Sequence, residues 1–525
     1  MDLSILFILA ILPMLLIFIG LVLFRQSGTL MGIFGWVLTV IIAVFFFQTS
    51  ASVALAASWE GVLSSFGISL MVLFSILQVT MMDVTGAISS ITAYIKTIAA
   101  ERYEQIMMLN VGFGTFLVSI GATPVTMLPP IMLALGFSPL AAVALPCLGY
   151  DPLTSFSLLA VPITLPAAAF GIDVRSLGIT VAWFLPVIST GIALAMLWVA
   201  DGWTGVKKGF FTALVAGLTL GLCAILFVHI LPAAAIGLVG VFSGLVTVAV
   251  LFLMRKIRGR PLDVAEPAAV QAAKDERKDK MPLWKAALPW VVLVIFCIVI
   301  SVPVIKSGLP SILGNMQKIP VMADQIVNLN LLSQAYFWVL ISTLITAPVL
   351  IRSKEQVGKI TKLWLKRAWS PTLAAMVFFA IAYVMDWSGK SVSNGALTLA
   401  PAASNMNVVI GLVLALIFGV AFPLFSPMLG LFGSFVSGSE TSSNVMFYGI
   451  LKKSTDVLNL DFLQVYAAHL VAGGIASGVA VAKIINAAAV VDKIGIEGEV
   501  VRKVAPVAII LTLVTGIMLV LMLYL

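Results

Sequence analysis

Residues 425–447 read FSPMLGLFGSFVSGSETSSNVMF, an apolar run that glycine and small polar side chains interrupt near its middle. Inside a bilayer, backbone groups left unpaired by a helix break are costly, so such a break survives only within protein or beside a water-filled cavity. A half-helix of about ten residues reaches about 15 Å, which is half of the hydrocarbon core. The stretch therefore predicts a re-entrant hairpin over about 424–451.

A second stretch of the chain has the same organisation. Residues 107–137 read MMLNVGFGTFLVSIGATPVTMLPPIMLALGF, and Phe113-Gly114-Thr115-Phe116 matches Phe432-Gly433-Ser434-Phe435. In both copies a small polar break and a short apolar run follow the match. This pattern predicts another hairpin over about 106–137.

Each predicted hairpin is followed by an apolar stretch that has its own break. The segment PCLGYDP (146–152) interrupts the first stretch, and Gly473-Gly474 interrupts the second. We therefore expect broken spans over about 139–170 and about 461–490. Broken helices that meet near the midplane form the binding sites of inverted-repeat secondary transporters.

The composition agrees with a chain that lies mostly in lipid. The 525 residues are 61% hydrophobic and only 10% charged, with a mean hydropathy of +1.16, whereas ordinary globular domains are about 25% charged. This excludes soluble enzymes, secreted disulfide scaffolds and nucleic-acid-binding proteins. The apolar runs are continuous rather than alternating, which excludes an outer-membrane barrel. The fold class is an all-α polytopic membrane protein.

Loop charge predicts the orientation of the spans. Basic residues gather in the loops 255–285 and 352–369, while Lys207, Lys208 and Arg25 follow other spans. Under the positive-inside rule these segments are cytoplasmic, and about 12 crossings then place both termini outside. The clear spans are predicted at about 3–24, 30–48, 61–82, 176–200, 210–229, 235–254, 286–306, 335–351, 371–387 and 505–525.

The number of crossings predicts an inverted repeat. The first repeat covers 1–200, a linking helix pair with a charged loop covers 201–285, and the second repeat covers 286–525. Because the crossings before the second repeat are odd in number, that repeat enters the membrane from the opposite face. Residues 407–423 are apolar enough to span, but a crossing there would break the parity. We expect them to lie along the interface or within the protein.

The second hairpin carries a resemblance to a known family. FSPMLGLFGSFVSGSETSSNVMF (425–447) is similar to a signature of the lactate permease family, whose members usually have Asp in place of Glu440. Asp201-Gly202-Trp203, with Gly205 and Lys207, fits that family's cytoplasmic turn. The resemblance covers nearly the whole chain. It implies proton-coupled uptake of lactate or glycolate and kinship with elevator-type ion transporters.

The chain departs from the family's pattern at two positions. The first hairpin of the family usually contains a glutamate and a glycine-rich tip, whereas residues 119–124 read SIGATP here. A glutamine in the family's second broken span aligns with Lys483. Both changes alter the charge near the expected site, and they bear on the substrate and the coupling ion.

The tips of the two hairpins are the candidate substrate site. Ser439, Glu440, Thr441, Ser442, Ser443 and Asn444 have the composition of a helix N-cap that opens a half-helix over 445–451. Free N–H groups and the positive end of the helix dipole suit a carboxylate. Ser119, Gly121 and Thr123 precede Pro124, which favours a second helix start at the other tip. The alternative is that both tips are ordinary polar loops.

Four ionisable residues of the predicted hairpins and broken spans are candidates for a functional role. Burial favours the neutral form of a carboxyl and a nearby cation favours the charged form, which makes Glu440 a candidate proton carrier. Lys483 lies midway along the second broken span and needs a partner, such as Glu440, Asp151 or the substrate carboxylate. The alternative is a lysine that snorkels to the interface. Asp151 and His469 are further candidates for proton coupling, against structural capping and hydrogen-bonded packing respectively.

No residue pattern predicts a catalytic or metal centre. The three cysteines (Cys147, Cys223, Cys297) and two histidines (His229, His469) are far apart in sequence and form no metal-binding motif. We expect no cofactor, no metal and no enzymatic activity. The expected partners are a small carboxylate, a proton and membrane lipid, and a homo-oligomer stays open.

These observations favour a proton symporter for lactate or a related small 2-hydroxymonocarboxylate in the cell membrane. A sodium-coupled carrier of another small organic anion is the alternative, because hydroxyl-rich and carbonyl-rich tips also suit Na⁺. A passive channel would need a continuous polar pore. A membrane enzyme would need a clustered metal, quinone or nucleophile site.

Overall fold

The computed structural model describes residues 2–525 except 23, 25, 27, 97–101, 121–123, 151, 259–280, 394, 401–403, 490, 492 and 494. Within this part of the chain, nine stretches of helix are long and apolar enough to cross a membrane. The protein is therefore a multi-pass, predominantly helical membrane protein, as predicted.

Among the described residues, every regular element in the first part of the chain is a helix. Its elements are α1 (Leu3–Val22), α2 (Gly28–Phe46), α3 (Ala51–Ser64), α4 (Phe66–Val84), α5 (Ala87–Lys96), α6 (Arg102–Ile106), the π-helix η1 (Met107–Phe113), α7 (Gly114–Ser119), α8 (Pro124–Ala134), α9 (Pro139–Leu148), the 3-10 turns η2 (Thr154–Phe156) and η3 (Leu158–Ala160), α10 (Val161–Phe170), α11 (Val174–Ile230), η4 (Ala233–Leu238) and α12 (Val239–Ile257).

The second part adds two short β-hairpins to the helices. Its elements are α14 (Leu283–Ala286), α15 (Leu288–Ser301), α16 (Pro303–Leu313), η5 (Gly314–Gln317), β1 (Lys318–Met322), β2 (Gln325–Asn328), η6 (Leu331–Ser333), α17 (Ala335–Leu350), α18 (Lys354–Trp387), β3 (Lys390–Ser393), β4 (Ala396–Leu399), α19 (Met406–Phe418), η7 (Gly419–Ala421), α20 (Phe422–Ser437), α21 (Glu440–Leu458), α22 (Phe462–Ile475), η8 (Ala476–Gly478), α23 (Val481–Ala489) and α24 (Glu497–Tyr524).

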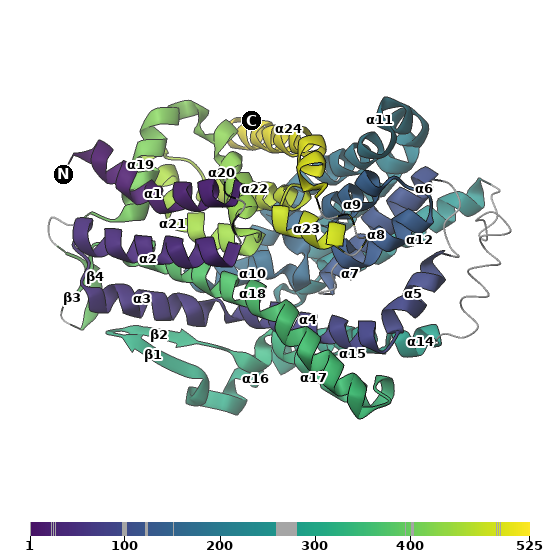
Figure 1. The fold of residues 1–525 in the computed structure, drawn as a ribbon. Helices are drawn as coiled ribbons and strands as arrows, with labels where there is room; N and C mark the ends of the chain where they lie inside the picture. Colours follow the sequence, from purple (N-terminus) through teal and green to yellow (C-terminus); the bar gives the residue numbers. More distant parts are fainter. Residues whose placement is uncertain are drawn as a thin grey trace.

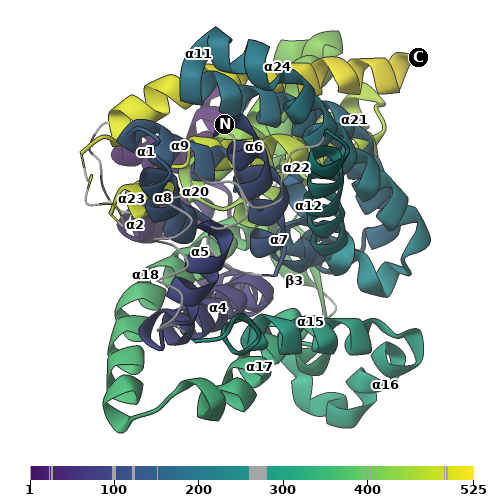
Figure 2. The same ribbon diagram turned by 90° about the vertical axis from the view of Figure 1, so that its right-hand side faces the viewer.

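The helices form two groups. In the first group, α1, α2 and α3 lie side by side, and α18 packs across α2, α3 and α4 (Figure 1). In the second, α22 lies centrally in the views of Figures 1 and 2 and packs against α11, α20, α21 and α24. Contacts of α18 and α19 with α21 join the two groups.

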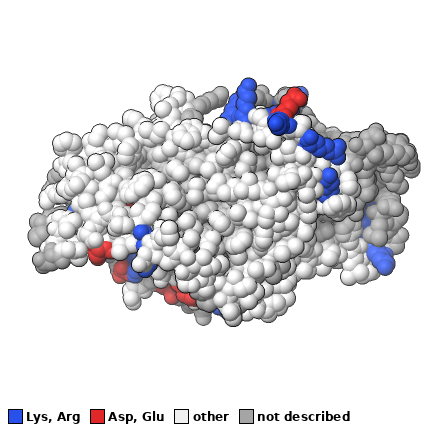
Figure 3. Space-filling model, turned by 90° about the horizontal axis from the view of Figure 1, so that it is seen from below, with Lys and Arg blue, Asp and Glu red and all other residues white. Residues whose placement is uncertain are grey.

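Charge is concentrated at the two ends of the molecule. Figure 3 shows a face with a wide uncharged band between ends that carry Lys, Arg, Asp and Glu. Such a band is what contact with lipid requires, because a charged side chain in hydrocarbon is costly. The turn of α11, α6 and α14 lie at one end, and β3, β4 and the N-terminus lie at the other (Figure 1).

Helix α11 is two antiparallel helices joined by a tight turn. The backbone leaves helical geometry at Asp201 and at Gly202, whose φ of 60° and ψ of −150° suit only glycine. A Cβ on Gly217 would lie 2.4 Å from the Cα of Thr190, so the two halves are in backbone contact. The predicted spans at 176–200 and 210–229 are thus separate legs of one helical hairpin. At the turn, Arg102 Nε lies 2.8 Å from a carboxylate oxygen of Asp201.

The prediction of a basic loop over 352–369 is wrong, because residues 354–369 form the first half of α18 (Lys354–Trp387). Ser353 caps this helix by accepting a hydrogen bond from the N–H of Gln356 at 3.2 Å. The lysine, glutamate, glutamine and leucine residues that follow are good helix formers even where they are exposed. Loop charge therefore located the basic end of the molecule, but it did not mark an irregular segment.

The predicted loop at 255–285 also begins too early, because α12 continues to Ile257. The side chain of Arg255 is 2% exposed, and its Nη1 lies 3.2 Å from Glu104 Oε2 in α6. A buried guanidinium needs such a partner. Residues 259–280 and Arg25 lie outside the described residues.

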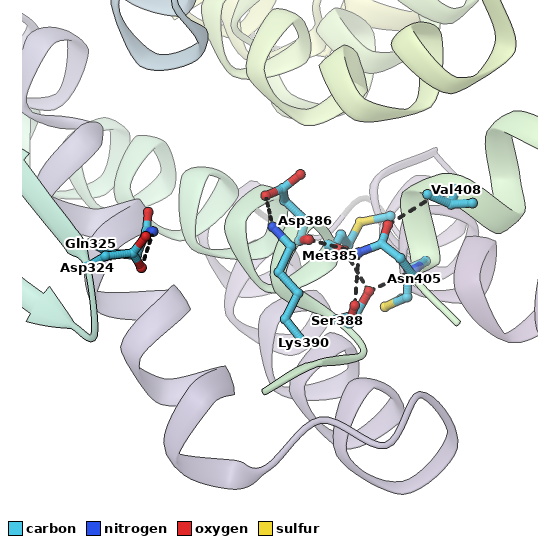
Figure 4. Close-up of polar contacts among 9 residues, drawn as sticks. Asp324, Gln325, Met385, Asp386, Ser388, Lys390, Asn405 and Val408 are labelled. Atoms are coloured by element: carbon cyan, nitrogen blue, oxygen red, sulfur yellow. Dashed lines mark hydrogen bonds and ion pairs between the residues drawn. The ribbon is translucent and has the colours of Figure 1, made fainter. Parts of the chain in front are cut away.

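The two β-hairpins, which the sequence analysis did not predict, lie beside the ends of long helices. In the turn between β1 and β2, Asp324 Oδ1 accepts a hydrogen bond from the N–H of Leu397 in β4, at 3.2 Å. Asn405 ties the end of α18 to the start of α19 (Figure 4). Its Nδ2 donates to the carbonyls of Met385, Asp386 and Ser388 at 3.2, 2.8 and 2.9 Å.

The second predicted hairpin contains α20 and α21, but its end and the break in the span that follows it differ from the prediction. Helix α21 runs to Leu458 rather than residue 451, because exposed charged residues such as Lys452 and Asp456 pair along its last turns, at 2.5 Å. The break in the following span is at residues 476–480, not at Gly473-Gly474, which lie inside α22. The two glycines instead allow neighbouring segments to pack closely against the backbone of α22.

Candidate functional site

The break in the first predicted broken span has unusual backbone geometry. It separates α9 from α10, and Thr154, Leu158, Leu159 and Ala160 all have φ between 48° and 57°. Left-handed geometry costs roughly 1–2 kcal/mol at each such residue. Strain of this kind persists only where the surrounding structure holds it, and it gathers at functional sites.

The tip of the second hairpin reaches this break. Ser439 caps α21 by accepting a hydrogen bond from the N–H of Ser442 at 3.3 Å, as its position predicts. Glu440 is the first residue of the helix and is only 6% exposed. Ser155 Oγ donates a short hydrogen bond to Glu440 Oε1. Residues 285 positions apart thus join the two predicted repeats.

Two adjacent glycines in α22 let three segments approach one another. A Cβ on Gly473 would lie 2.9 Å from Ser434 Oγ and 3.0 Å from Glu440 Cγ. A Cβ on Gly474 would lie 2.4 Å from the Cβ of Thr154. The backbone of α22 is therefore the floor against which α20, α21 and the first break pack.

Buried oxygens without partners gather around this floor. Thr154 Oγ1, Ser434 Oγ, Ser442 Oγ and Asn444 Oδ1 accept or donate no hydrogen bond among the described residues. A buried polar atom left unpaired costs about 1–3 kcal/mol, and proteins keep few of them. The atoms belong to three elements of the chain, η2, α20 and α21, which is the arrangement expected of a site that binds a polar ligand.

Asn444 connects the second hairpin to α10. Its Nδ2 donates to the backbone carbonyl of Pro162 at 3.0 Å, while the backbone carbonyl of Asn444 accepts from Tyr466 Oη at 2.8 Å. The amide is fully buried. These two bonds leave Asn444 Oδ1 on the side of Gly473, 3.6 Å from the position of the missing Cβ.

His469 lies beneath the start of α21. Its Nε2 is 3.3 Å from Ser443 Oγ, and its ring stacks on Tyr466 with centroids 6.2 Å apart. Its Nδ1 has no hydrogen-bond partner among the described residues. The carbonyl of His469 presses on Gly430, where a Cβ would come within 2.1 Å. These contacts hold α22 against both helices of the second hairpin.

Lys483 contacts both breaks. Its Nζ donates to Ser477 Oγ at 2.6 Å in η8 and lies 3.8 Å from the ring centroid of Tyr150. Ser477 is one helical turn beyond Gly473. The ammonium group therefore bridges the break of the second span and the residues that begin the first break.

The first hairpin tip is described only in part. Ser119 is fully buried at the end of α7, and its Oγ would lie 2.3 Å from a Cβ on Gly240. The carbonyl of Phe156, next to Ser155, would lie 2.6 Å from the same point. Ser119 and the first break thus both lie against Gly240 of α12. Gly121, Thr123 and Asp151 lie outside the described residues, and α8 begins at Pro124 as predicted.

Sequence reasoning missed three of the residues that surround Glu440. Thr154 and Ser155 follow Asp151-Pro152, and hydroxyl residues in an apolar run beside a break were the available signal. Ser434 lies within the repeated Phe-Gly-Thr/Ser-Phe match, and its counterpart Thr115 is also buried with an unpaired Oγ1 among the described residues. Thr441, the residue after Glu440, is also buried. Within the described chain, no group of three His, Cys, Asp or Glu side chains is placed to hold a metal.

Comparison with known proteins finds relatives that match most of the chain. A family model described as L-lactate permease matches residues 6–525. The glycolate permease GlcA of Escherichia coli (strain K12) is 24% identical, over 98% of this chain and 95% of its own length. The L-lactate permease of Bacillus subtilis (strain 168) is 25% identical, over 94% and 91%. That of Streptococcus iniae is 24% identical, over 86% and 92%. Since the family model covers all but the first few residues, the chain belongs to the L-lactate permease family.

Proposed function

We propose that this protein is a secondary transporter that carries lactate, or a related 2-hydroxymonocarboxylate such as glycolate, across the cell membrane together with a proton. The observation that supports this most directly is the buried contact between Ser155 and Glu440. Around it lie unpaired oxygens from three elements, which suit a small polar ligand. The names of these relatives, glycolate permease and L-lactate permease, agree with this substrate class.

The start of α21 holds the substrate carboxylate in this proposal. Backbone N–H groups and the positive end of the helix dipole favour an anion there. The hydroxyls of Thr441, Ser442 and Ser443 lie in the same buried turn and add donors. Asn444 Oδ1 accepts from the substrate's 2-hydroxyl group. Lys483, held by Ser477 and lying over the ring of Tyr150, adds a positive charge.

Glu440 carries the coupled proton. An ionised Glu440 and a carboxylate substrate would repel each other in the same buried site, where charges interact more strongly than in water. Protonation of Glu440 removes that repulsion, so proton and substrate binding favour each other. His469 supports the hairpin through Ser443, and Asp151 is a second candidate for proton carriage at the first break.

Access to the site requires movement of the chain. Glu440, Ser434 and Asn444 are 6%, 3% and 0% exposed, so a substrate reaches them only when neighbouring elements separate. We propose that the hairpins and broken spans move as a unit against α1–α4, α17 and α18. The proposed inverted repeats at 1–200 and 286–525, joined by 201–285, provide the two equivalent gates. The protein is then a carrier rather than an enzyme.

Substrate and ion are tested together in reconstituted vesicles. Uptake of labelled lactate and glycolate is measured with an inward proton gradient or an inward sodium gradient at equal membrane potential. We expect accumulation with the proton gradient alone. Accumulation driven only by sodium would instead assign the oxygen-rich site to Na⁺, and transport of neither acid would refute the substrate class.

Glu440→Gln tests the coupling role in the same vesicles. We expect proton-driven accumulation to be lost while exchange of labelled for unlabelled lactate continues. The glutamine side chain keeps an acceptor oxygen for Ser155, but it cannot take up and release a proton. Glu440→Asp, the residue usual in the family, should retain accumulation. Unchanged accumulation by Glu440→Gln would remove this residue from the mechanism.

A further inference from the structure

A groove lies beside the first hairpin, and none of the residues around Glu440 lines it. It has a volume of about 480 Å³ and is lined by apolar side chains of α5, η1, α7, α12, α14 and α15. Figure 2 shows α5, α7, α12 and α15, which contribute to its walls. Wall residues such as Leu245, Val291 and Ile295 are about half exposed, so the groove is open along one side.

The groove has the length of one bilayer leaflet. On α12 its wall runs from Val241 to Phe252, a rise of about 16 Å at 1.5 Å per residue. The hydrocarbon core is about 30 Å thick, so half of it is about 15 Å. On the facing wall, Leu283 and Ile295 mark a stretch of similar length on α14 and α15. The shape fits a single extended acyl chain.

The end of the groove near Phe252 and Leu283 carries positive charge. Lys256 is one helical turn beyond Phe252 and therefore continues the same face of α12. Lys285 lies in the turn of α14 that supplies Leu283. Among the described residues neither lysine forms an ion pair, whereas Arg255 pairs with Glu104 and Arg258 stacks on Phe211. The basic end of the molecule is the cytoplasmic end.

We propose that this groove binds an anionic phospholipid of the cytoplasmic leaflet. One acyl chain fills the apolar slot between the first hairpin and α15, and the headgroup lies at Lys256 and Lys285. The inference does not depend on the transported substrate. Because Phe113 and Phe116 of the first hairpin form part of the wall, the lipid completes the packing behind that hairpin.

The test uses the fluorescence of Trp290, which lines the groove. The full chain and its Trp290→Phe variant are reconstituted in phosphatidylcholine vesicles. To these vesicles is added a lipid brominated on its acyl chain, which is either phosphatidylglycerol or phosphatidylcholine. The signal lost with Trp290→Phe isolates this residue among the 11 tryptophans. We expect its quenching to need roughly tenfold less brominated phosphatidylglycerol, because two lysines attract an anionic headgroup.

Matched charge variants separate a built site from general attraction to the basic end. Lys256→Gln with Lys285→Gln should abolish the preference for phosphatidylglycerol. Lys207→Gln with Lys208→Gln, which neutralises two exposed lysines at the same end, should leave it intact. Equal quenching by the two brominated lipids, or equal loss of preference in both double variants, would overturn the proposal.

Discussion

At the scale of single residues, the glycine pair in α22 shows how one residue type can be misread. Gly473-Gly474 resembles a helix break in sequence, yet the helix continues through both positions to Ile475. The missing side chains instead admit Ser434, Glu440 and Thr154 to the backbone. Close backbone approach and helix termination both select glycine, and only the neighbours distinguish the two uses.

Gly473→Ala tests this role. The new methyl group would come within 3.0 Å of Ser434 Oγ and Glu440 Cγ, so the hairpin tip must shift. We expect transport to fall by about 100-fold, since displacements near 1 Å in a site have effects of that size. The measurement is initial lactate uptake in vesicles that contain equal amounts of folded protein.

The matched control is Gly358→Ala on the exposed first half of α18. Nothing lies within 4 Å of a Cβ at Gly358. Alanine favours a helix over glycine by about 1 kcal/mol, so this variant should transport normally and unfold no more readily. Similar activity of the two variants would show that the space beside Gly473 is not used.

At the scale of elements, side-chain caps decide how the helices are joined. Asn405 holds three carbonyls at the end of α18, and its Oδ1 accepts from the N–H of Val408 at 3.1 Å, which caps α19 (Figure 4). One side chain thus satisfies the end of one helix and the start of the next. The site uses the same device at Ser439, where the cap places Glu440 at the first position of α21.

Asn405→Ala should lower the stability of the protein by about 2–3 kcal/mol, since the three carbonyls at the end of α18 lose their donor and each bond contributes about 1 kcal/mol. The measurement is the thermal unfolding midpoint of the purified protein in one detergent. Asn405→Asp retains the cap on Val408 but faces the three carbonyls with negative charge. It should be at least as destabilising as alanine; a midpoint like that of the unaltered protein would limit the role of Asn405 to capping.

At the scale of the whole molecule, the arrangement suggests which parts move. Helices α2, α3, α4 and α18 pack tightly on one another, and α20, α21, α22 and α24 do the same around the site. A point of contact between the groups is Gly67 in α4, where a Cβ would lie 2.3 Å from Leu165 Cδ1 in α10. Under the proposed mechanism α10 moves with the site, so this contact changes during transport.

A cross-link between these positions tests the movement. In a chain with Cys147, Cys223 and Cys297 replaced by alanine, cysteines at Gly67 and Leu165 are joined by a short thiol-specific reagent that a reductant cleaves. We expect transport to stop on cross-linking and to return on cleavage, because the link prevents the groups from separating.

The control joins two positions within the first group. A Cβ on Gly32 in α2 would lie 3.5 Å from Val377 Cγ1 in α18. Cysteines at Gly32 and Val377 should cross-link without loss of transport. Full activity with the link between positions 67 and 165 in place would show that α4 and α10 do not move apart.

The amino-acid sequence by itself determined the class of protein, most of the spans, the basic end and the cap at Ser439. It could do so because lipid is a uniform solvent that admits only long apolar helices with internally paired backbone. Capping is likewise local, since Ser439 needs only the N–H groups of the next turn. The resemblance in the second hairpin pointed to the family that the whole-chain comparison then established.

Only the tertiary structure decided which groups surround Glu440. Ser155 reaches it across 285 positions, and the glycine pair in α22 faces Thr154 on one side and Ser434 on the other. The burial of Arg255 against Glu104 is of the same kind. Such pairings arise from packing between elements distant in the chain, so no local pattern of hydropathy or capping contains them.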